Sequence, residues 1–243
     1  MRRTTLAVLV ASAVALLAPA AAQALSVYGA TSLTNVFPAI DKSPSYSFGG
    51  SNTLQLQIER GAPADVFASA SPTEAQALFR EGLCTRPVTF AINRLVVLIP
   101  NANPGNVRSV YSLRSGGRRV SIGTAGVPIG AYTRQLLKRM RLSSILSSNT
   151  VSQQTNVGQV VSQVALGAAD AGFVYYTDGL AAKDRTKMLS LPKWAQPPVR
   201  YQICAVKRAG ADTSGAAAFI KKVVGPSGRA ALKGYGFGLP PRK

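Results

Sequence analysis

The stretch "SFGGSNTLQLQIERGAPADVFASAS", residues 47–71, decides the fold of this chain. It begins with two glycines and small polar residues, becomes apolar, breaks at "GAP" (61–63) and becomes apolar again. The first apolar part is ambiguous, because Leu54, Leu56 and Ile58 alternate as in a strand while Leu54 and Ile58 also share one face of a helix. The second part is typical of a short buried strand. Gly49 and Gly50, near the start of the stretch, allow backbone to approach a ligand closely.

The remainder of the chain alternates short apolar strands with helical segments. Strands are expected at residues 25–29, 46–48, 94–100, 118–123, 171–178 and 199–207. Helices are expected at residues 32–40, 71–82, 131–140 and 155–167, and in two segments between 216 and 238. Ser32 is a candidate N-cap of the first helix, and Ser71 is expected to cap the second in a capping box with Glu74. This alternation predicts an α/β fold with mostly parallel sheets, in which ligands bind at the carboxyl ends of the strands.

The first 24 residues are typical of a secretory signal peptide. Arg2 and Arg3 precede the apolar run "LAVLVASAVALLAPAAA", and Ala22-Gln23-Ala24 matches an A-x-A cleavage site. A membrane anchor is the alternative, but no basic stop-transfer run follows, and no cysteine lies at the cleavage point to carry a lipid. The mature chain is then expected to be Leu25–Lys243 and periplasmic. The sequence leaves the Sec and twin-arginine export routes both open.

The chain is strongly basic, with 28 Lys and Arg against 9 Asp and Glu and a formal net charge of +19. A positive field attracts anions, but the basic residues are scattered and are not interleaved with aromatic residues as in RNA-binding segments. The sequence contains no His, which excludes Ser-His-Asp and Cys-His catalytic units and the usual zinc sites. Cys84 and Cys204 are the only cysteines. They either form a disulfide in an oxidising compartment or remain buried thiols.

Small polar residues follow several of the predicted strands. They are Thr31-Ser32, Gly49–Thr53, Thr124–Gly130 and Tyr175–Thr177. Where such strand ends converge on one cleft, hydroxyls and the N–H groups of helix starts form a site for an anion without any formal charge. This site suits an oxyanion that carries no proton, because a monoprotonated phosphate also needs an acceptor for its own O–H. Each cluster alone is explained as well by a helix cap or a turn.

Several strings, in order along nearly the whole mature chain, resemble the periplasmic molybdate-binding proteins of ABC importers. They are "ATSLTNVFPAI", "FGGSNTLQLQIERGAPADVFASAS", "NRLVVLIP", "GVPIGAYTRQLL", "ALGAADAGFVYYTD" and "GPSGRAALKGYGF". The resemblance implies a type II periplasmic-binding-protein fold with two α/β lobes joined by crossover strands. It implies that residues 25–88 and 203–243 form lobe 1 and residues 89–202 form lobe 2. It also makes the ambiguous segment a helix that begins near Ser51.

The same resemblance implies a ligand set for molybdate or tungstate in the cleft between the lobes. It places the hydroxyl ligands on Ser32, Ser51 and Tyr175, the main-chain N–H donors on Ile129 and Val157, and secondary candidates on Thr31 and Asn52. It implies a monomeric importer subunit that delivers the anion to a membrane permease. On this reading the protein is not an enzyme, has no cofactor or cation site, and binds no nucleic acid.

The chain departs from the family pattern at three points. Ile129 stands where the family usually has a small residue, the link between residues 32–40 and "SFGGSN" is shorter than usual, and Gly158 stands where the family often has arginine. Sulfate or another tetrahedral oxyanion remains an alternative ligand, because the sequence does not give the cavity radius. More remote alternatives are a secreted basic module for polyanions and a serine hydrolase that uses Ser51 or Ser227, which lacks a G-x-S-x-G elbow as well as histidine.

Overall fold

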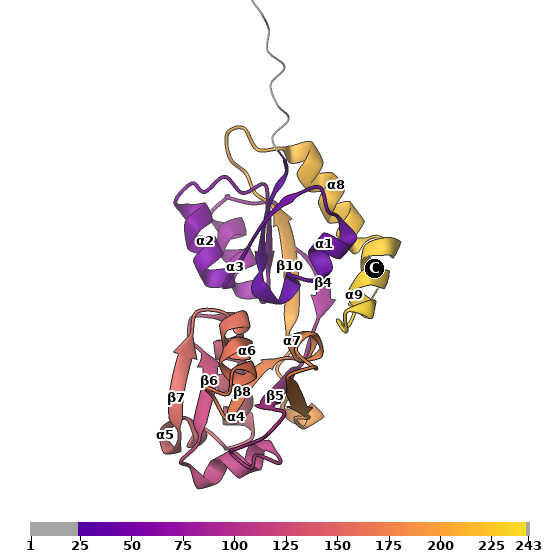
Figure 1. The fold of residues 1–243 in the computed structure, drawn as a ribbon. Coiled ribbons are helices and arrows are strands. Elements are labelled where there is room, and N and C mark those ends of the chain that lie inside the picture. Colours follow the sequence, from indigo (N-terminus) through magenta and orange to yellow (C-terminus); the bar gives the residue numbers. More distant parts are fainter. Residues whose placement is uncertain (1–23, 242–243) are drawn as a thin grey trace, which may run out of the picture.

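The protein has two lobes, each built on a five-stranded sheet (Figure 1). The structure is a computed structural model that describes residues 24–241, so the expected signal peptide, except for its last residue, lies outside the described residues. The first sheet has the strand order β2-β1-β3-β10-β4, and the second has the order β7-β6-β8-β5-β9. Among residues 24–241, no helix is both long and apolar enough to cross a membrane.

Both sheets are mixed, with two parallel and two antiparallel strand pairings in each, where mostly parallel sheets were predicted. The first contains β1 (Ser26–Ala30), β2 (Ser45–Gly49), β3 (Val66–Ser69), β4 (Val88–Ile92) and β10 (Arg200–Ala205). The second contains β5 (Leu95–Pro100), β6 (Arg119–Gly123), β7 (Thr150–Gln154), β8 (Ala171–Tyr175) and β9 (Thr186–Leu189). In each sheet one strand is antiparallel to both neighbours, β10 in the first and β5 in the second. The predicted α/β fold class is confirmed.

Helices cover the sheets in both lobes. The first lobe carries the 3-10 helix η1 (Thr31–Leu33) and helices α1 (Val36–Ile40), α2 (Ser51–Glu59), α3 (Pro72–Arg80), α8 (Thr213–Val224) and α9 (Pro226–Gly234). Helices α2 and α3 lie on one side of its sheet, and α1, α8 and α9 lie on the other (Figure 1). The second lobe carries η2 (Val110–Ser115), α4 (Pro128–Arg139), α5 (Ile145–Ser148), α6 (Val157–Ala165), α7 (Tyr176–Ala181) and η3 (Lys193–Ala195).

The ambiguous apolar segment is the helix α2. Leu54 and Ile58 are buried at 3% and 4% relative exposure, whereas Leu56 between them is 47% exposed. A strand with one buried face would have buried all three side chains, so the helical period is the one that the core uses. The chain then returns through "GAP" into β3, which pairs in parallel with β1. The quoted stretch thus forms one complete helix–strand unit of the first lobe.

One predicted helix cap and one predicted capping box are wrong, whereas the other predicted cap is confirmed. Ser32 lies inside η1 and caps no helix, because α1 begins later, after Asn35. Ser71 does cap α3, since its hydroxyl accepts from the Thr73 N–H at 3.2 Å. The capping box with Glu74 is absent, because the Glu74 carboxylate accepts from the hydroxyls of Ser69 and Ser71. The Ser71 N–H, which the box would use, donates instead to the Ser69 hydroxyl at 3.1 Å.

The lobe boundaries expected after residues 88 and 202 fall inside β4 and β10. Both strands pair along their length within the first sheet, so neither can be divided between lobes. We propose that the lobes divide at residues 93–94, between β4 and β5, and at residues 196–199, before β10. Two short segments therefore join the lobes, as expected of a hinged binding protein.

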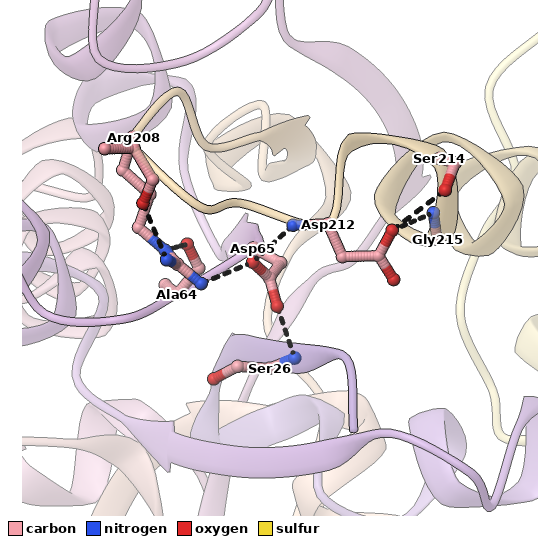
Figure 2. Close-up of polar contacts among 8 residues, drawn as sticks. Ser26, Ala64, Asp65, Arg208, Asp212, Ser214 and Gly215 are labelled. Carbon is pink, nitrogen blue, oxygen red and sulfur yellow. Dashed lines mark hydrogen bonds and ion pairs between the residues drawn. The ribbon is translucent and has the colours of Figure 1, made fainter. Parts of the chain in front are cut away.

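A buried carboxylate joins several segments of the first lobe (Figure 2). It lies at the end of the sheet that is remote from the second lobe (Figure 1). Asp65, which precedes β3, accepts from the Ser26 N–H at 2.9 Å and from the Asp212 N–H at 3.1 Å. It also pairs with the Arg208 guanidinium at 2.6 Å. Asp212 in turn caps α8 by accepting from the Gly215 N–H at 2.8 Å. The network joins β1, β3 and the segment that leads from β10 into α8.

The two cysteines are free thiols in the structure. Both are buried in an apolar cluster that includes Phe67 and Leu78. A hydrogen bond with Cys84, together with burial, raises the pKa of Cys204. The disulfide considered for this pair is therefore not formed in the described structure, and the thiols serve as small apolar side chains in the core.

Candidate functional site

A small cavity lies between the two lobes. The first lobe lines it with Ala30, Thr31, Ser32, Gly49, Gly50, Ser51 and Ala70, and the second with Val127, Pro128, Ile129, Asn156, Val157 and Tyr175. The set includes all five expected ligand residues and Thr31, but not Asn52. None of these lining side chains carries a charge. Elsewhere in the described chain, no group of three His, Cys, Asp or Glu side chains is placed to hold a metal ion.

Three helices begin at this cavity. They are α2 at Ser51, α4 at Pro128 and α6 at Val157, and each first residue lines the cavity. The first N–H groups of a helix have no carbonyl partner within the helix, and the aligned peptide dipoles place partial positive charge there. The convergence of three helix starts makes the cavity attractive to an anion although no cationic side chain lines it.

The start of α4 makes the main-chain N–H of Ile129 available. Its N-cap, Val127, has no polar side chain, and Pro128 at the first helical position has no N–H. Ile129 therefore supplies the first N–H donor of this helix. The isoleucine side chain is part of the hydrophobic core. It is buried against Gly123 at the end of β6, where an added β-carbon would lie 2.7 Å from Ile129 Cγ2. The missing side chain of Gly123 makes the room that this residue needs.

The start of α6 leaves the N–H of Val157 free. The side chain of Asn156, the N-cap, accepts from the Gln159 N–H at 3.0 Å, and Gln159 in turn accepts from the Thr155 N–H at 3.0 Å. These two contacts satisfy backbone donors on either side of Val157. The N–H of Val157, at the first helical position, keeps no partner within the helix and borders the cavity.

Hydroxyl groups add further donors. Ser51, 1% exposed, accepts a hydrogen bond from the Ala70 N–H at 3.1 Å, so its own hydrogen is free to donate. Ser32 lies 2.8 Å from the Tyr201 hydroxyl. Within the described residues, the buried Tyr175 hydroxyl has no hydrogen-bond partner, and neither do Thr31 Oγ1 and Asn52 Oδ1. Burial raises the pKa of Tyr175 well above its usual value, so this phenol remains a hydrogen-bond donor.

The lobes approach each other closely around the cavity. A β-carbon on Gly50 would lie 2.3 Å from the Thr155 carbonyl oxygen, and one on Gly158 would lie 2.7 Å from Thr31 Cγ2. Each contact pairs a glycine of one lobe with a residue of the other. Glycine at position 158, where the family often has arginine, thus permits η1 and α6 to pack together. The lobes are closed over the cavity in this structure.

The comparisons with known proteins fit this architecture. A family model described as bacterial extracellular solute-binding protein matches residues 25–238. The chain belongs to this family. The solute-binding protein is 31% identical to the molybdate-binding protein ModA of Mycobacterium tuberculosis, with 90% of this chain and 86% of the relative covered. It is 30% identical to ModA of Escherichia coli, with 88% of each chain covered. A solved periplasmic molybdate-binding protein of Azotobacter vinelandii matches with a TM-score of 0.78 at 29% identity, covering 89% of this chain and all of that one.

A tyrosine of the second lobe lies next to the first lobe of the solute-binding protein. The hydroxyl of Tyr132 on α4 is near the Ser71 side chain and the Arg200 backbone of the first lobe. Its burial raises the pKa of its hydroxyl to about 12, so it remains protonated at physiological pH. Sequence analysis did not single out Tyr132, because its role depends on a contact between helices that are far apart in the chain.

A partly buried aspartate lies on the hinge side of the solute-binding protein. Asp178 on α7 lines a second, larger cleft together with residues of η1, α1 and the C-terminal segment. Among the described residues its Oδ2 atom has no hydrogen-bond partner. Burial raises the pKa of Asp178 to about 7, against two backbone hydrogen bonds that lower it. This carboxyl group therefore changes charge near neutral pH.

Sequence reasoning also missed Asn93 and Tyr201, which stand behind the cavity. Tyr201 on β10 is fully buried, and its hydroxyl contacts Ser32 and Asn93. Neither residue belongs to a strand-end cluster of small polar residues, which was the signal used to find the site. A buried tyrosine in a strand next to an interlobe connection is the pattern that would have directed attention to Tyr201.

Proposed function

We propose that this solute-binding protein captures molybdate or tungstate in the cavity between its lobes and delivers it to the permease of an ABC importer. The proposed ligands are the hydroxyls of Ser32, Ser51 and Tyr175 and the N–H groups of Ile129 and Val157. Thr31 is a secondary candidate that lines the cavity, and Asn52, the second residue of α2, is a secondary candidate that does not line it. On this proposal the protein performs no catalysis and needs no cofactor.

The observation that carries the proposal is the hydrogen-bonding character of the cavity. The two main-chain groups can only donate, and Ser51 already accepts from the Ala70 N–H. A fully ionised tetrahedral oxyanion accepts at every oxygen, so such a set can surround it with charge-assisted hydrogen bonds. The partial positive charge of three helix starts offsets part of the cost of removing the dianion from water. The curated relatives, which are named for molybdate binding, support the choice of anion.

The setting of the proposed function follows from the family. We infer that the protein acts in the periplasm after export, as a monomer whose partners are the anion and a membrane permease. We infer that the net positive charge, +19 with Arg2 and Arg3 of the expected signal peptide included, concentrates anions near the cleft, and no nucleic-acid partner is proposed. Opening and closing of the lobes about residues 93–94 and 196–199 would admit and release the ligand.

Thermal unfolding with a panel of anions tests this proposal. A ligand that binds only the folded state at 1,000 times its dissociation constant stabilises it by about 4 kcal/mol. We expect molybdate and tungstate to raise the melting temperature strongly and phosphate to have little effect. The Ser51→Ala variant should lose most of the molybdate shift while melting at a similar temperature without ligand.

The other outcomes separate the alternatives. A large shift with sulfate and none with molybdate would keep the oxyanion site and change the assigned anion. Stabilisation by polyanions that declines steeply with added salt, without any shift by small oxyanions, would favour a polyanion-binding surface. No shift with molybdate or tungstate would overturn the proposed function.

A further inference from the structure

A chain of hydrogen bonds leads from an interlobe connection to the cavity. Asn93, between β4 and β5, lies with its Nδ2 atom 3.4 Å from the Tyr201 hydroxyl and 3.0 Å from Thr177 Oγ1. The Tyr201 hydroxyl lies 2.8 Å from Ser32 Oγ. Ser32 lines the cavity, whereas Asn93 and Tyr201 do not. The chain therefore connects a proposed ligand residue to groups that never touch the ligand.

Asn93 determines which groups donate and which accept in this series of hydrogen bonds. Its carbonyl oxygen accepts from the Arg94 N–H at 2.9 Å, which fixes which end of the side-chain amide faces that way. The opposite end, toward Tyr201 and Thr177, is then the NH₂ group. An amide NH₂ can only donate, so the Tyr201 hydroxyl is the acceptor in this contact.

The phenol hydrogen of Tyr201 must then go to Ser32. Among the described residues, Ser32 Oγ is the remaining hydrogen-bond partner of the Tyr201 hydroxyl. Tyr201 is fully buried, and a buried donor without an acceptor carries the full cost of its lost hydration. Burial raises the pKa of Tyr201 well above its usual value, so the phenol keeps this hydrogen. Tyr201 therefore donates to Ser32.

The hydroxyl hydrogen of Ser32 is directed toward the cavity. One lone pair of the Ser32 oxygen accepts from Tyr201, and no acceptor for the Ser32 hydrogen is found among the described residues, so a ligand in the cavity is its remaining acceptor. Ser51 on the opposite side is set in the same way, because its oxygen accepts from the Ala70 N–H. The main-chain N–H of Ala70 therefore orients the Ser51 hydroxyl, and the side chains of Asn93 and Tyr201 orient the Ser32 hydroxyl.

We propose that Tyr201 and Asn93 are positioning residues that make Ser32 an obligate hydrogen-bond donor, and that they thereby help the site reject oxyanions that carry a proton. This inference rests on the proposed oxyanion function and deepens it. Hydrogen phosphate and molybdate carry the same charge, but hydrogen phosphate must place one O–H against an acceptor. A serine that can rotate to accept would tolerate that O–H, and a serine held by Tyr201 does not.

The test is the ratio of two dissociation constants in Tyr201→Phe. Titration calorimetry at pH 8 measures molybdate and hydrogen phosphate, both dianions at this pH. Removing the phenol hydroxyl frees Ser32 to donate or to accept, so we expect molybdate to bind about 5- to 30-fold more weakly. Hydrogen phosphate should bind with unchanged or improved affinity. The ratio of the two constants should therefore narrow by about fivefold or more.

A second variant reverses the direction of these hydrogen bonds without a change at Tyr201. In Asn93→Asp a carboxylate accepts the phenol hydrogen, so Tyr201 Oη accepts from Ser32 and the serine presents a lone pair to the cavity. The added negative charge weakens both dianions alike, so the ratio reports the direction of the hydrogen bonds. We expect the ratio of the two dissociation constants to narrow as in Tyr201→Phe. The matched control is Tyr46→Phe, which removes a tyrosine hydroxyl bonded to the Phe37 and Asp41 carbonyls and should leave the ratio unchanged.

The outcomes are distinct. An equal loss of affinity for both anions in Tyr201→Phe and Asn93→Asp would show a merely structural role and overturn the inference, as would no change in either variant. If Tyr201→Phe does not fold, the ratio in Asn93→Asp decides alone. Absence of molybdate binding by the wild-type protein would instead overturn the proposed function. If the wild-type protein binds sulfate in its place, the same ratio is measured with sulfate.

Discussion

Gly50 of the first lobe lies directly against the Thr155 carbonyl of the second. A β-carbon on Gly50 would approach that oxygen to 2.3 Å, a distance that side chains do not tolerate. The backbone of Gly50 itself, with φ of −65° and ψ of 133°, is open to any residue. The glycine is therefore required by the closed contact between the lobes and not by the local turn.

Gly50→Ala should prevent full closure without unfolding either lobe. The methyl group meets backbone, which cannot rotate away, so the closed state must shift or open. We expect molybdate affinity to fall by about tenfold or more, while the melting temperature without ligand changes little. Titration calorimetry and small-angle scattering with and without ligand check both expectations. Gly234→Ala, where an added β-carbon meets nothing within 4 Å, is the control, and equal affinities in the two variants would contradict the prediction.

Ser51→Ala should weaken molybdate binding by about 10- to 100-fold, because a hydrogen bond to a charged group contributes about 1.5–3 kcal/mol. The variant also leaves the Ala70 N–H without its partner, so a loss of about 1 kcal/mol in the free energy of unfolding is expected as well. Titration calorimetry and urea unfolding measure the two effects. Ser147→Ala, at an exposed serine of α5, is the control. Wild-type affinity in Ser51→Ala would remove this residue from the site.

Asp178→Asn should stabilise the protein at high pH. The pKa of Asp178 is raised from 3.8 to about 7 in the folded protein, so the folded state keeps a proton that the unfolded chain releases. This group therefore lowers the free energy of unfolding by about 1.4 kcal/mol for each pH unit between about 4 and 7. Because the asparagine side chain cannot ionise, the free energy of unfolding of the variant lacks this decline with pH.

Melting curves at pH 5 and pH 8 decide this prediction. The advantage of Asp178→Asn over the wild type should grow from about 1.4 kcal/mol at pH 5 to about 4 kcal/mol at pH 8. Asp184→Asn makes the same chemical change at an exposed position and serves as the control. A pH-independent difference between Asp178→Asn and the wild type would mean that the carboxyl group stays ionised throughout this range.

Asp65→Ala should destabilise the first lobe severely. The change leaves the Arg208 guanidinium and the N–H groups of Ser26 and Asp212 without their acceptor (Figure 2). Breaking a buried ion pair from one side costs about 3–5 kcal/mol. By contrast, Asp41→Ala removes a surface pair with Lys222 and should cost about 1 kcal/mol or less. Urea unfolding compares them, and similar midpoints for the two variants would show that the Asp65 network contributes little.

The sequence was informative where one local pattern determined the outcome. Alternation of strands and helices gave the fold class, and the resemblance placed a helix at Ser51, which the burial of Leu54 and Ile58 explains. It was misleading where a nearby partner competed for the same group. Glu74 has the spacing of a capping box with Ser71, in which its carboxylate would accept from the Ser71 N–H. In the structure that N–H donates instead to the Ser69 hydroxyl at the end of β3, and the Ser69 hydroxyl donates to Glu74.

Contacts between distant segments could not be read from the sequence. From the sequence, Ile129 was a larger residue than the family usually has at this position. The residue that makes room for its side chain, Gly123, lies outside its helix and is its neighbour only in space. Tyr201 and Asn93 lie 108 residues apart and meet only because β4 and β10 pair in the same sheet. The five residues of the proposed ligand set, named from resemblance, line one cavity; what sets the direction of their hydrogen bonds becomes visible only in three dimensions.

The place of β10 in the first sheet governs the order in which the chain can be completed. This strand lies between β3 and β4 and pairs with both, yet it follows the entire second lobe in the sequence. A growing chain that has not reached residue 205 leaves β3 and β4 without the neighbour that joins them, whereas all strands of the second sheet end by Leu189. The lobe that is synthesised first is therefore the lobe that is finished last.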